Sequence, residues 1–175
     1  MRAIVSLMSV CLAASCIGTT PEEELASEQG SDPAGEDGPT HRPGQRCLAC
    51  HGADYSPGDA VFVVAGTVYR RVGDADTAGL SDAEVELSDD AGEVFTVITN
   101  QAGNFMMSVG EGDEDEGWVG LPRAPVFPLK AVVRYRGEEQ EMRNVIQREG
   151  ACAACHDRSG KGAASNGKVF VEKTP

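Results

Sequence analysis

Two short motifs with identical spacing contain most of the side chains in this chain that could carry chemistry. They span Cys47–His51 and Cys152–His156, and each reads Cys-x-x-Cys-His, in a chain that has only three histidines. With this spacing, one helical turn presents two thiols to the two vinyl groups of a haem, and the adjacent imidazole can ligate the iron. The motifs therefore predict two covalently attached c-type haems. The thioether positions are Cys47, Cys50, Cys152 and Cys155, and the proximal iron ligands are His51 and His156.

Few side chains are left to act as the second axial ligand of each iron. Once the motif histidines are assigned, His41 is the only one remaining, so a histidine pair at both irons is impossible within one chain. His41 lies six residues before Cys47, where it can fold back onto the first motif or reach the second. Met142 and Met106 are the other distal candidates, since methionine also ligates haem iron.

The first fifteen residues have the pattern of an export signal. Arg2 is the only charged residue in this stretch, and the apolar run that follows is shorter than the ~20 residues of a membrane-spanning helix. The run ends in small residues before Cys16, which resembles the lipobox of bacterial lipoproteins. The resemblance implies that Cys16 is lipidated and anchors the chain to a membrane, and Ile17 favours the outer one. Ordinary cleavage nearby would instead leave Cys16 as a free thiol.

The four motif cysteines have other chemical uses, namely zinc binding, disulfides and redox pairs. Zinc requires reduced thiolates, which an exported protein rarely keeps. Redox pairs normally lie in a thioredoxin-like frame, and the sequence shows none. None of these uses explains why a histidine follows both second cysteines, so haem attachment is the favoured interpretation.

An acidic segment separates the export signal from the motifs. Residues 17–40 hold seven acidic side chains and no basic one, which predicts a disordered tether. We therefore predict the following organisation: signal peptide 1–15, lipidated tether 16–40, first haem-attachment segment 41–59, β-sandwich 60–147, and second haem-attachment segment with a terminal strand 148–175.

The region between the motifs has the pattern of short β-strands. β-branched, aromatic and alternating segments are separated by turns rich in Gly, Asn and Asp, which favours an antiparallel sandwich. Strands are expected at 61–69, 83–87, 93–99, 104–109, 126–136 and 168–172. Within 104–109, the period of two puts Phe105, Met107 and Val109 on one face. Met107 is then a core residue, whereas Met106 faces the other side and can meet a haem.

Three stretches of this region resemble a known family. Gly66–Tyr69, Leu80–Leu87 and Phe95–Phe105 look like the carboxypeptidase regulatory-like, or transthyretin-like, β-sandwich. The resemblance implies a mainly β fold with seven strands in Greek-key order and no catalysis of its own. With a Cys-x-x-Cys-His motif on each side, the whole chain resembles small di-haem c-type cytochrome lipoproteins of bacteria.

The motif segments are too short to enclose a haem by themselves. Residues 41–59 and 148–167 are also rich in glycine. Each haem must therefore pack against the sandwich, against the other haem or against a partner protein. We therefore expect both motifs to converge on one end or face of the sandwich. The expected strand at 168–172 would hold the second motif against the sheet.

The charge balance narrows the possible partners. The net charge of −13 argues against nucleic acid, which needs a cationic surface. The acidic run Glu111–Glu116 lacks the spacing of a calcium loop and is expected to be a solvated loop that steers basic redox proteins. The sequence thus favours an electron carrier over an enzyme, exported to the periplasmic or cell-surface face of the outer membrane. Two alternatives remain open: a peroxidase-like haem enzyme with an open iron site, and a sandwich binding module that carries haems.

Overall fold

The computed structural model describes residues 21–30, 38–53, 60–156 and 167–172. The predicted export signal and Cys16 lie outside the described residues. No helix in the described ranges combines the length and the apolar character needed to cross a membrane. The helical elements are α1 (Pro21–Glu28), α2 (Cys47–His51), η1 (Glu114–Glu116) and η2 (Cys152–Ala154). The strands are β1 (Val64–Tyr69), β2 (Glu84–Ser88), β3 (Val94–Ile98), β4 (Asn104–Val109), β5 (Trp118–Leu121), β6 (Lys130–Tyr135), β7 (Glu138–Glu141) and β8 (Val169–Phe170).

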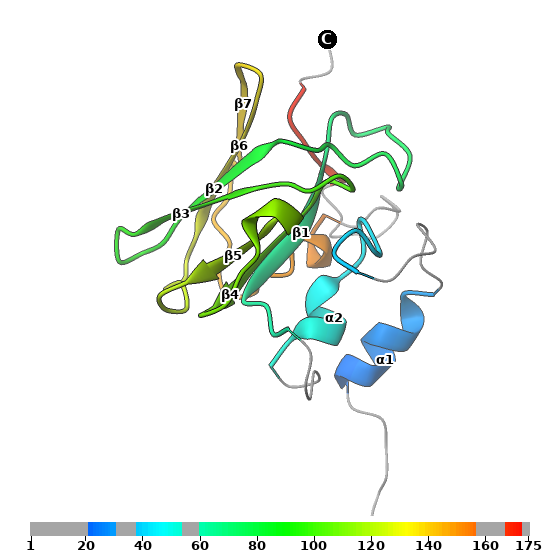
Figure 1. Cartoon of the computed structure of the whole chain (residues 1–175), viewed down its shortest axis with the longest axis vertical. Coiled ribbons are helices and arrows are strands. Elements are labelled where there is room, and N and C mark those ends of the chain that lie inside the picture. The colour runs from blue at the N-terminus through cyan, green and yellow to red at the C-terminus, as the bar shows by residue number, and fades with distance from the viewer. Residues whose placement is uncertain (1–20, 31–37, 54–59, 157–166, 173–175) are drawn as a thin grey trace, which may run out of the picture.

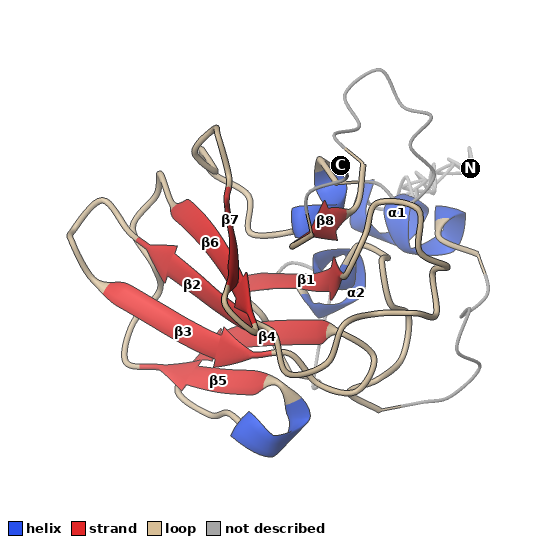
Figure 2. Cartoon of the chain, turned by 90° about the horizontal axis from the view of Figure 1, so that it is seen from above, coloured by secondary structure: helices blue, strands red, loops and turns tan. Residues whose placement is uncertain are grey.

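The described strands form two four-stranded sheets, which makes the fold mainly β and consistent with a β-sandwich (Figures 1 and 2). The strand orders are β5-β4-β1-β8 and β3-β2-β6-β7. Every pair in the second sheet is antiparallel, but β1 pairs with β8 and β4 with β5 in parallel. The prediction of a purely antiparallel fold is therefore wrong for the first sheet. The cause lies at its edges, since the chain reaches β5 and β8 through crossover segments and not through hairpins.

All six expected strands are present, although the one expected at 126–136 begins only at Lys130. Two strands, β5 and β7, were not predicted. β7 reads Glu-Glu-Gln-Glu, a composition that is poor in strand-forming residues. It forms because Arg136 and Gly137 both have positive φ, 47° and 87°, and close a tight hairpin onto β6.

The main core lies between the sheets. In β2 and β3, buried and more exposed residues alternate, so that one face of this sheet packs inward. The inward side chains of both sheets form one cluster that includes Val85, Leu87, Phe105 and Met107. Met107 is fully buried there, which confirms its predicted place, whereas Val109 at the end of β4 is 52% exposed.

The first sheet is covered on its outer face as well. All six residues of β1 and the first five of β4 are buried. Ala65 and Met106 point away from the main core and form a second cluster with Phe62, against which Cys47 and Leu48 pack. Met106 therefore faces the side opposite to Met107, as the alternation predicts. One covering element, α2, carries the first Cys-x-x-Cys-His motif, whereas Cys152 of the second motif packs against the main core cluster.

Part of the predicted tether is helical. α1 begins at Pro21, and the Gln29 side chain after it exchanges hydrogen bonds with the backbone of Arg46, beside α2. The prediction of disorder is therefore wrong for Pro21–Glu28. Acidity was the misleading feature, because glutamate is a good helix former, and proline is well placed at the first helical position. Residues 16–20 and 31–37 of the predicted tether lie outside the described residues.

The buried carboxylate of Asp89 joins two loops and gives the first testable prediction. It accepts hydrogen bonds from the backbone N–H of Glu93 and of Val126, and its Oδ2 lies 2.8 Å from Arg123 Nη1. Burial alone would raise the pKa of Asp89, but the bonds from Val126, Arg123 and Glu93 outweigh it and hold the pKa at about 2. The ionised carboxylate therefore stabilises the fold fully above pH ~4 and loses this effect as the pH falls toward 2.

We expect Asp89→Asn to lower the midpoint of thermal unfolding at pH 7 and to flatten the acid limb of stability below pH ~4. Thermal melts of both proteins across this pH range measure the effect. Asp90→Asn, at the exposed neighbouring position, is the matched control and should behave like the wild type. Equal melting curves for Asp89→Asn and wild type at every pH would contradict the prediction.

Candidate functional site

The first motif forms the single helical turn that its spacing predicts. α2 spans Cys47–His51 and ends at Gly52, where a side chain would collide with the Leu48 carbonyl oxygen at 2.5 Å. The His51 ring packs on Phe62, with 4.8 Å between centroids, and its Nδ1 lies 3.0 Å from the carbonyl oxygen of Ala60. The N–H of Phe62, in the segment just before β1, donates to the His51 carbonyl oxygen and ties the backbone of the motif to that segment.

The second motif also forms one helical turn, although it is a 3₁₀ turn. η2 covers Cys152–Ala154, and the N–H of His156 donates to the Cys152 carbonyl oxygen at 2.8 Å. Nδ1 of His156 lies 2.8 Å from the carbonyl oxygen of Gly167. Gly167 lies two residues before β8, which pairs with β1, and this confirms that the last strand holds the second motif segment on the sheet.

The two motif histidines share one hydrogen-bond arrangement. A carbonyl oxygen can only accept, so Nδ1 of His51 and of His156 must each carry the proton. In a neutral imidazole, this places the lone pair on Nε2, the nitrogen that can then ligate a metal. Metal-ligating histidines typically donate their other N–H to a carbonyl or carboxylate, which fixes the ring. Both rings are therefore held in the tautomer that puts the lone pair on Nε2.

Both motifs lie against β1, so the predicted convergence is confirmed. Ala151, just before the second motif, forms a parallel bridge with Ala65. A side chain on Gly66 would come within 2.7 Å of Cys152 Cβ, so η2 packs directly on the strand. Arg46, just before the first motif, donates from Nη2 to the Ala154 carbonyl oxygen at 3.4 Å. Figure 2 shows α2 and β8 gathered beside β1 at one end of the sheets.

The thiols of Cys47 and Cys152, which lie where the two motifs meet, have a higher pKa than the thiols of reactive cysteines. Burial raises the pKa of Cys47 to about 11. Burial and then the nearby Cys47 raise the pKa of Cys152 to about 12. Both thiols are thus protonated at neutral pH, whereas zinc binding and thiol redox chemistry use the thiolate. No disulfide joins the four described cysteines, and within the described residues no three His, Cys, Asp or Glu side chains are grouped to hold a metal ion.

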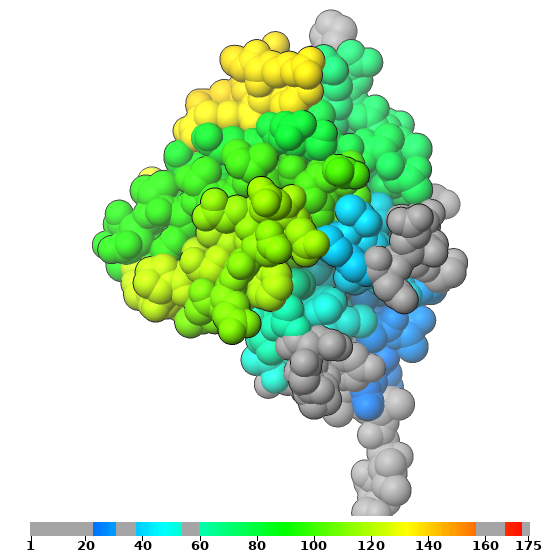
Figure 3. Space-filling view, viewed as in Figure 1, coloured from blue at the N-terminus to red at the C-terminus, as the bar shows by residue number. Residues whose placement is uncertain are grey.

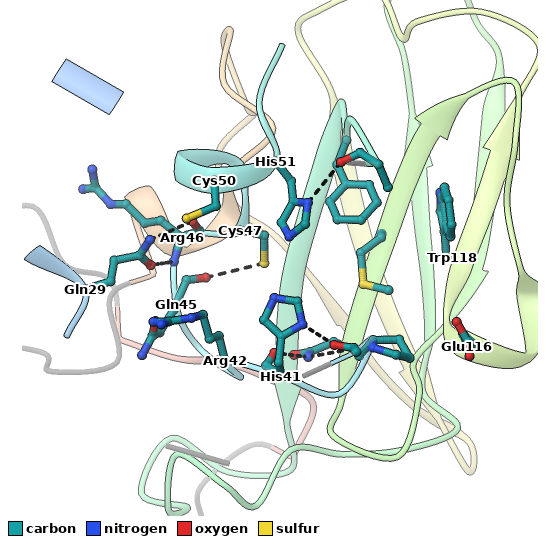
Figure 4. Close-up of a pocket in the computed structure, with 16 residues that line it drawn as sticks. Gln29, His41, Arg42, Gln45, Arg46, Cys47, Cys50, His51, Glu116 and Trp118 are labelled. Carbon is teal, nitrogen blue, oxygen red and sulfur yellow. Dashed lines mark hydrogen bonds between the residues drawn. The ribbon is translucent and has the colours of Figure 1, made fainter. Parts of the chain in front are cut away.

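A cavity of about 440 Å³ opens beside the first motif. Its lining combines the motif side chains Cys47, Cys50 and His51 with apolar groups of the first sheet, among them Met106 and Trp118. Figure 4 shows this lining, with the His51 and His41 rings close to one another and Cys47 beside them. A largely apolar cavity of this size with a few convergent ligating groups is typical of cofactor sites.

The three predicted distal candidates are placed differently. His41 and Met106 both line the cavity beside His51. Met142 follows β7 in the second sheet, where its N–H donates to the Ala131 carbonyl oxygen, and it is not part of the lining. The structure thus brings two of the three candidates to the first motif.

Several residues of this site were missed by sequence reasoning. Trp118 lines the cavity and donates from Nε1 to Ser108 Oγ at 2.7 Å, and its ring meets Phe62 edge-on. It is the only tryptophan of the chain, and that was the one available signal. The position of Trp118 could not be predicted because β5, the strand that carries it, was not predicted either.

No family model, curated protein or solved structure matches this chain. The resemblance to the carboxypeptidase regulatory-like sandwich therefore stays a prediction. The site itself offers four motif thiols, two imidazoles that carry the proton on Nδ1, and a largely apolar cavity.

The contact between Gly66 and Cys152 gives a second prediction. We expect Gly66→Ala to displace η2 from β1, because the new Cβ would lie 2.7 Å from Cys152 Cβ and 3.0 Å from a ring carbon of Phe105. Such overpacking costs about 1–3 kcal/mol. Urea unfolding measures the loss, and limited proteolysis should show earlier cleavage near the second motif. Gly73→Ala is the control, since a Cβ added at this exposed residue would meet nothing within 4 Å. Equal stability of the two variants would contradict the prediction.

Proposed function

We propose that the protein is an electron carrier, a di-haem c-type cytochrome with one haem attached at each motif. The observation that carries the proposal is the repeated arrangement of His51 and His156, whose Nδ1 atoms both meet a backbone carbonyl at 2.8–3.0 Å. Two disulfides or two zinc-binding pairs would not require a histidine fixed in this way after each second cysteine.

The side chains of the two motifs and of the cavity would have different roles in such a site. The cysteines of each motif would hold the haem covalently, and Nε2 of each motif histidine would ligate the iron. Bound haem supplies an iron that gains and loses one electron. The apolar lining, which includes Phe62, Met106 and Trp118, would keep water away from the first site and so help to set its potential. Since both motifs pack on β1, the two attachment sites are neighbours on one strand.

The proposal includes the setting of the protein. An exported chain anchored by lipid at Cys16, on the periplasmic or cell-surface face of the outer membrane, would meet other redox proteins there. The acidic run 111–116 is exposed throughout, and Glu116 at its end lines the cavity beside the first motif. Basic redox partners would therefore be steered toward this site. The Greek-key connectivity of the carboxypeptidase regulatory-like sandwich is part of the same proposal.

The proposal is tested by expressing the full chain in a host with and without a c-haem maturation system. We expect a haem-stained band on denaturing gels only in the first host, and a visible spectrum that changes reversibly on reduction and reoxidation. Loss of all haem on denaturation, or a spectrum that reductants leave unchanged, would refute electron transfer by covalent haem.

A further inference from the structure

We infer that His41 is the second axial ligand of the iron at the first motif, and that buried polar residues of the first sheet hold it there. This inference rests on the proposed function, and it names one of the groups that would decide the properties of the site. The loop 38–45, which carries His41, crosses the outer face of the first sheet beside the segment around η1 (Figure 3), and Asn100 Nδ2 donates to the carbonyl oxygens of both Pro39 and Glu116.

The separation of the His41 and His51 rings, which are tilted by 51° to one another, suits a shared metal ion. The His41 and His51 ring centroids are 5.7 Å apart, and both rings line the same cavity. Imidazole–metal bonds are about 2 Å long, so two rings on opposite sides of one ion have centroids roughly 6 Å apart. The observed separation is close to this value.

The tautomer of His41 also suits ligation. Its Nδ1 forms a hydrogen bond with the carbonyl oxygen of Gly38, which places the proton on Nδ1 and the lone pair on Nε2. His41 thus shares the arrangement of the two motif histidines, although it belongs to no motif. All three histidines of the chain are therefore prepared in the same way.

The sheet fixes the backbone that carries His41. Asn104 is 3% exposed, and its Nδ2 donates to the carbonyl oxygens of His41 at 3.0 Å and of Pro39 at 3.2 Å. Asn100 donates from Nδ2 to the same Pro39 oxygen at 2.8 Å. Thr67, the cross-strand neighbour of Asn104, donates to Asn104 Oδ1, and its Oγ1 accepts from the N–H of Gly44.

These bonds explain why polar side chains lie at buried positions in and beside β1 and β4. A buried polar group destabilises a protein unless it is hydrogen-bonded. Here the three side chains are hydrogen-bonded to one another or to one another's backbone, and also to the backbone of the loop that carries His41. They are Thr67, Asn100 and Asn104. The consequence is that the His41 ring is held beside His51 before any cofactor binds.

Met106, the other candidate at the cavity, is already engaged in packing. It is 5% exposed and forms the second cluster with Phe62 and Ala65. Its place is thus set by apolar contacts within the sheet, whereas His41 lies on a loop that buried polar side chains hold over the cavity. The structure therefore favours His41 over Met106 as the ligand.

The assignment makes the two sites unequal. The chain has three histidines, so the iron at His156 cannot receive a second histidine from the same chain. We therefore expect a histidine pair at the first site only.

The test compares the wild-type holoprotein with His41→Ala and with Met106→Leu, a matched change in the same cavity. Electron paramagnetic resonance and near-infrared magnetic circular dichroism report the axial ligands. We expect His41→Ala to lose the histidine-pair signal, about half of the total haem, and added imidazole to restore it. Met106→Leu should keep that signal. An unchanged spectrum for His41→Ala, or loss of the signal in Met106→Leu alone, would overturn the inference.

The role of Asn104 in positioning His41 can be measured separately from the ligation itself. Asn104→Ala should retain both covalent haems but reduce the histidine-pair signal and shift the midpoint potential of one haem only. A purely structural role of Asn104 would lower stability and leave both the ligand signal and the potentials unchanged.

Two further outcomes separate this inference from the proposed function. Absence of haem on denaturing gels of the wild type would refute the proposed function itself. Two covalent haems without a histidine-pair band in the wild-type spectrum would refute only the role of His41. This wild-type measurement also decides the question if His41→Ala yields no folded protein.

Discussion

Replacing both Cys47 and Cys50 with alanine is expected to lower the haem content from two per chain to one. The same result is expected for Cys152→Ala with Cys155→Ala, and the two pairs are separable because each motif has its own helical turn and its own carbonyl partner for the histidine. Thioether attachment requires the thiols, so no covalent haem can form at the altered motif. Haem absorbance per polypeptide after denaturation measures the ratio.

The control for this prediction is Leu48→Ala, which changes a filler residue of the first motif and keeps both thiols. It should retain two haems per chain. An unaltered haem content in both double-cysteine variants would show that these thiols are not the attachment points.

Replacing Met107 with alanine is expected to lower the free energy of unfolding by about 2–5 kcal/mol, the range found for large-to-small changes in a core. Met107 is fully buried between the sheets and belongs to the main core. Removing most of its side chain leaves a cavity that neighbours in both sheets cannot fill without moving. Denaturant unfolding of the holoprotein gives the change directly.

The control is Val109→Ala, two residues further along the same strand, where the side chain is 52% exposed. Its expected change is within about 0.5 kcal/mol, as for most surface substitutions. Similar losses for both variants would mean that the alternation of β4 does not separate a core face from a surface position.

The motifs and the alternation at 104–107 could be predicted because each depends on local spacing. One helical turn suffices to bring the two thiols of a motif together, and a period of two suffices to put Met106 and Met107 on opposite faces. The convergence of the two motifs could be predicted because the segments around them are too short to enclose a haem by themselves. These features need no knowledge of which strand pairs with which.

The remaining features depend on long-range packing. β7 is a run of acidic and amide residues that becomes a strand only through its hairpin with β6. Thr67 and Asn104 are polar residues within strands, which in sequence look like solvent-facing positions; they are buried because the loop 38–45 covers them. α1 was hidden by its acidity, although its residues favour a helix and it lies beside α2 (Figure 1).

The most direct test of covalent haem attachment is the intact mass of the denatured full chain, purified from a host with a c-haem maturation system. The reference is the variant with alanine at all four motif cysteines, processed in the same host. We predict that the wild type is heavier than this reference by two haems and the four sulfur atoms of the substituted cysteines. A wild-type mass that differs from the reference only by the substituted atoms would contradict haem attachment at Cys47, Cys50, Cys152 and Cys155, and with it the proposed function.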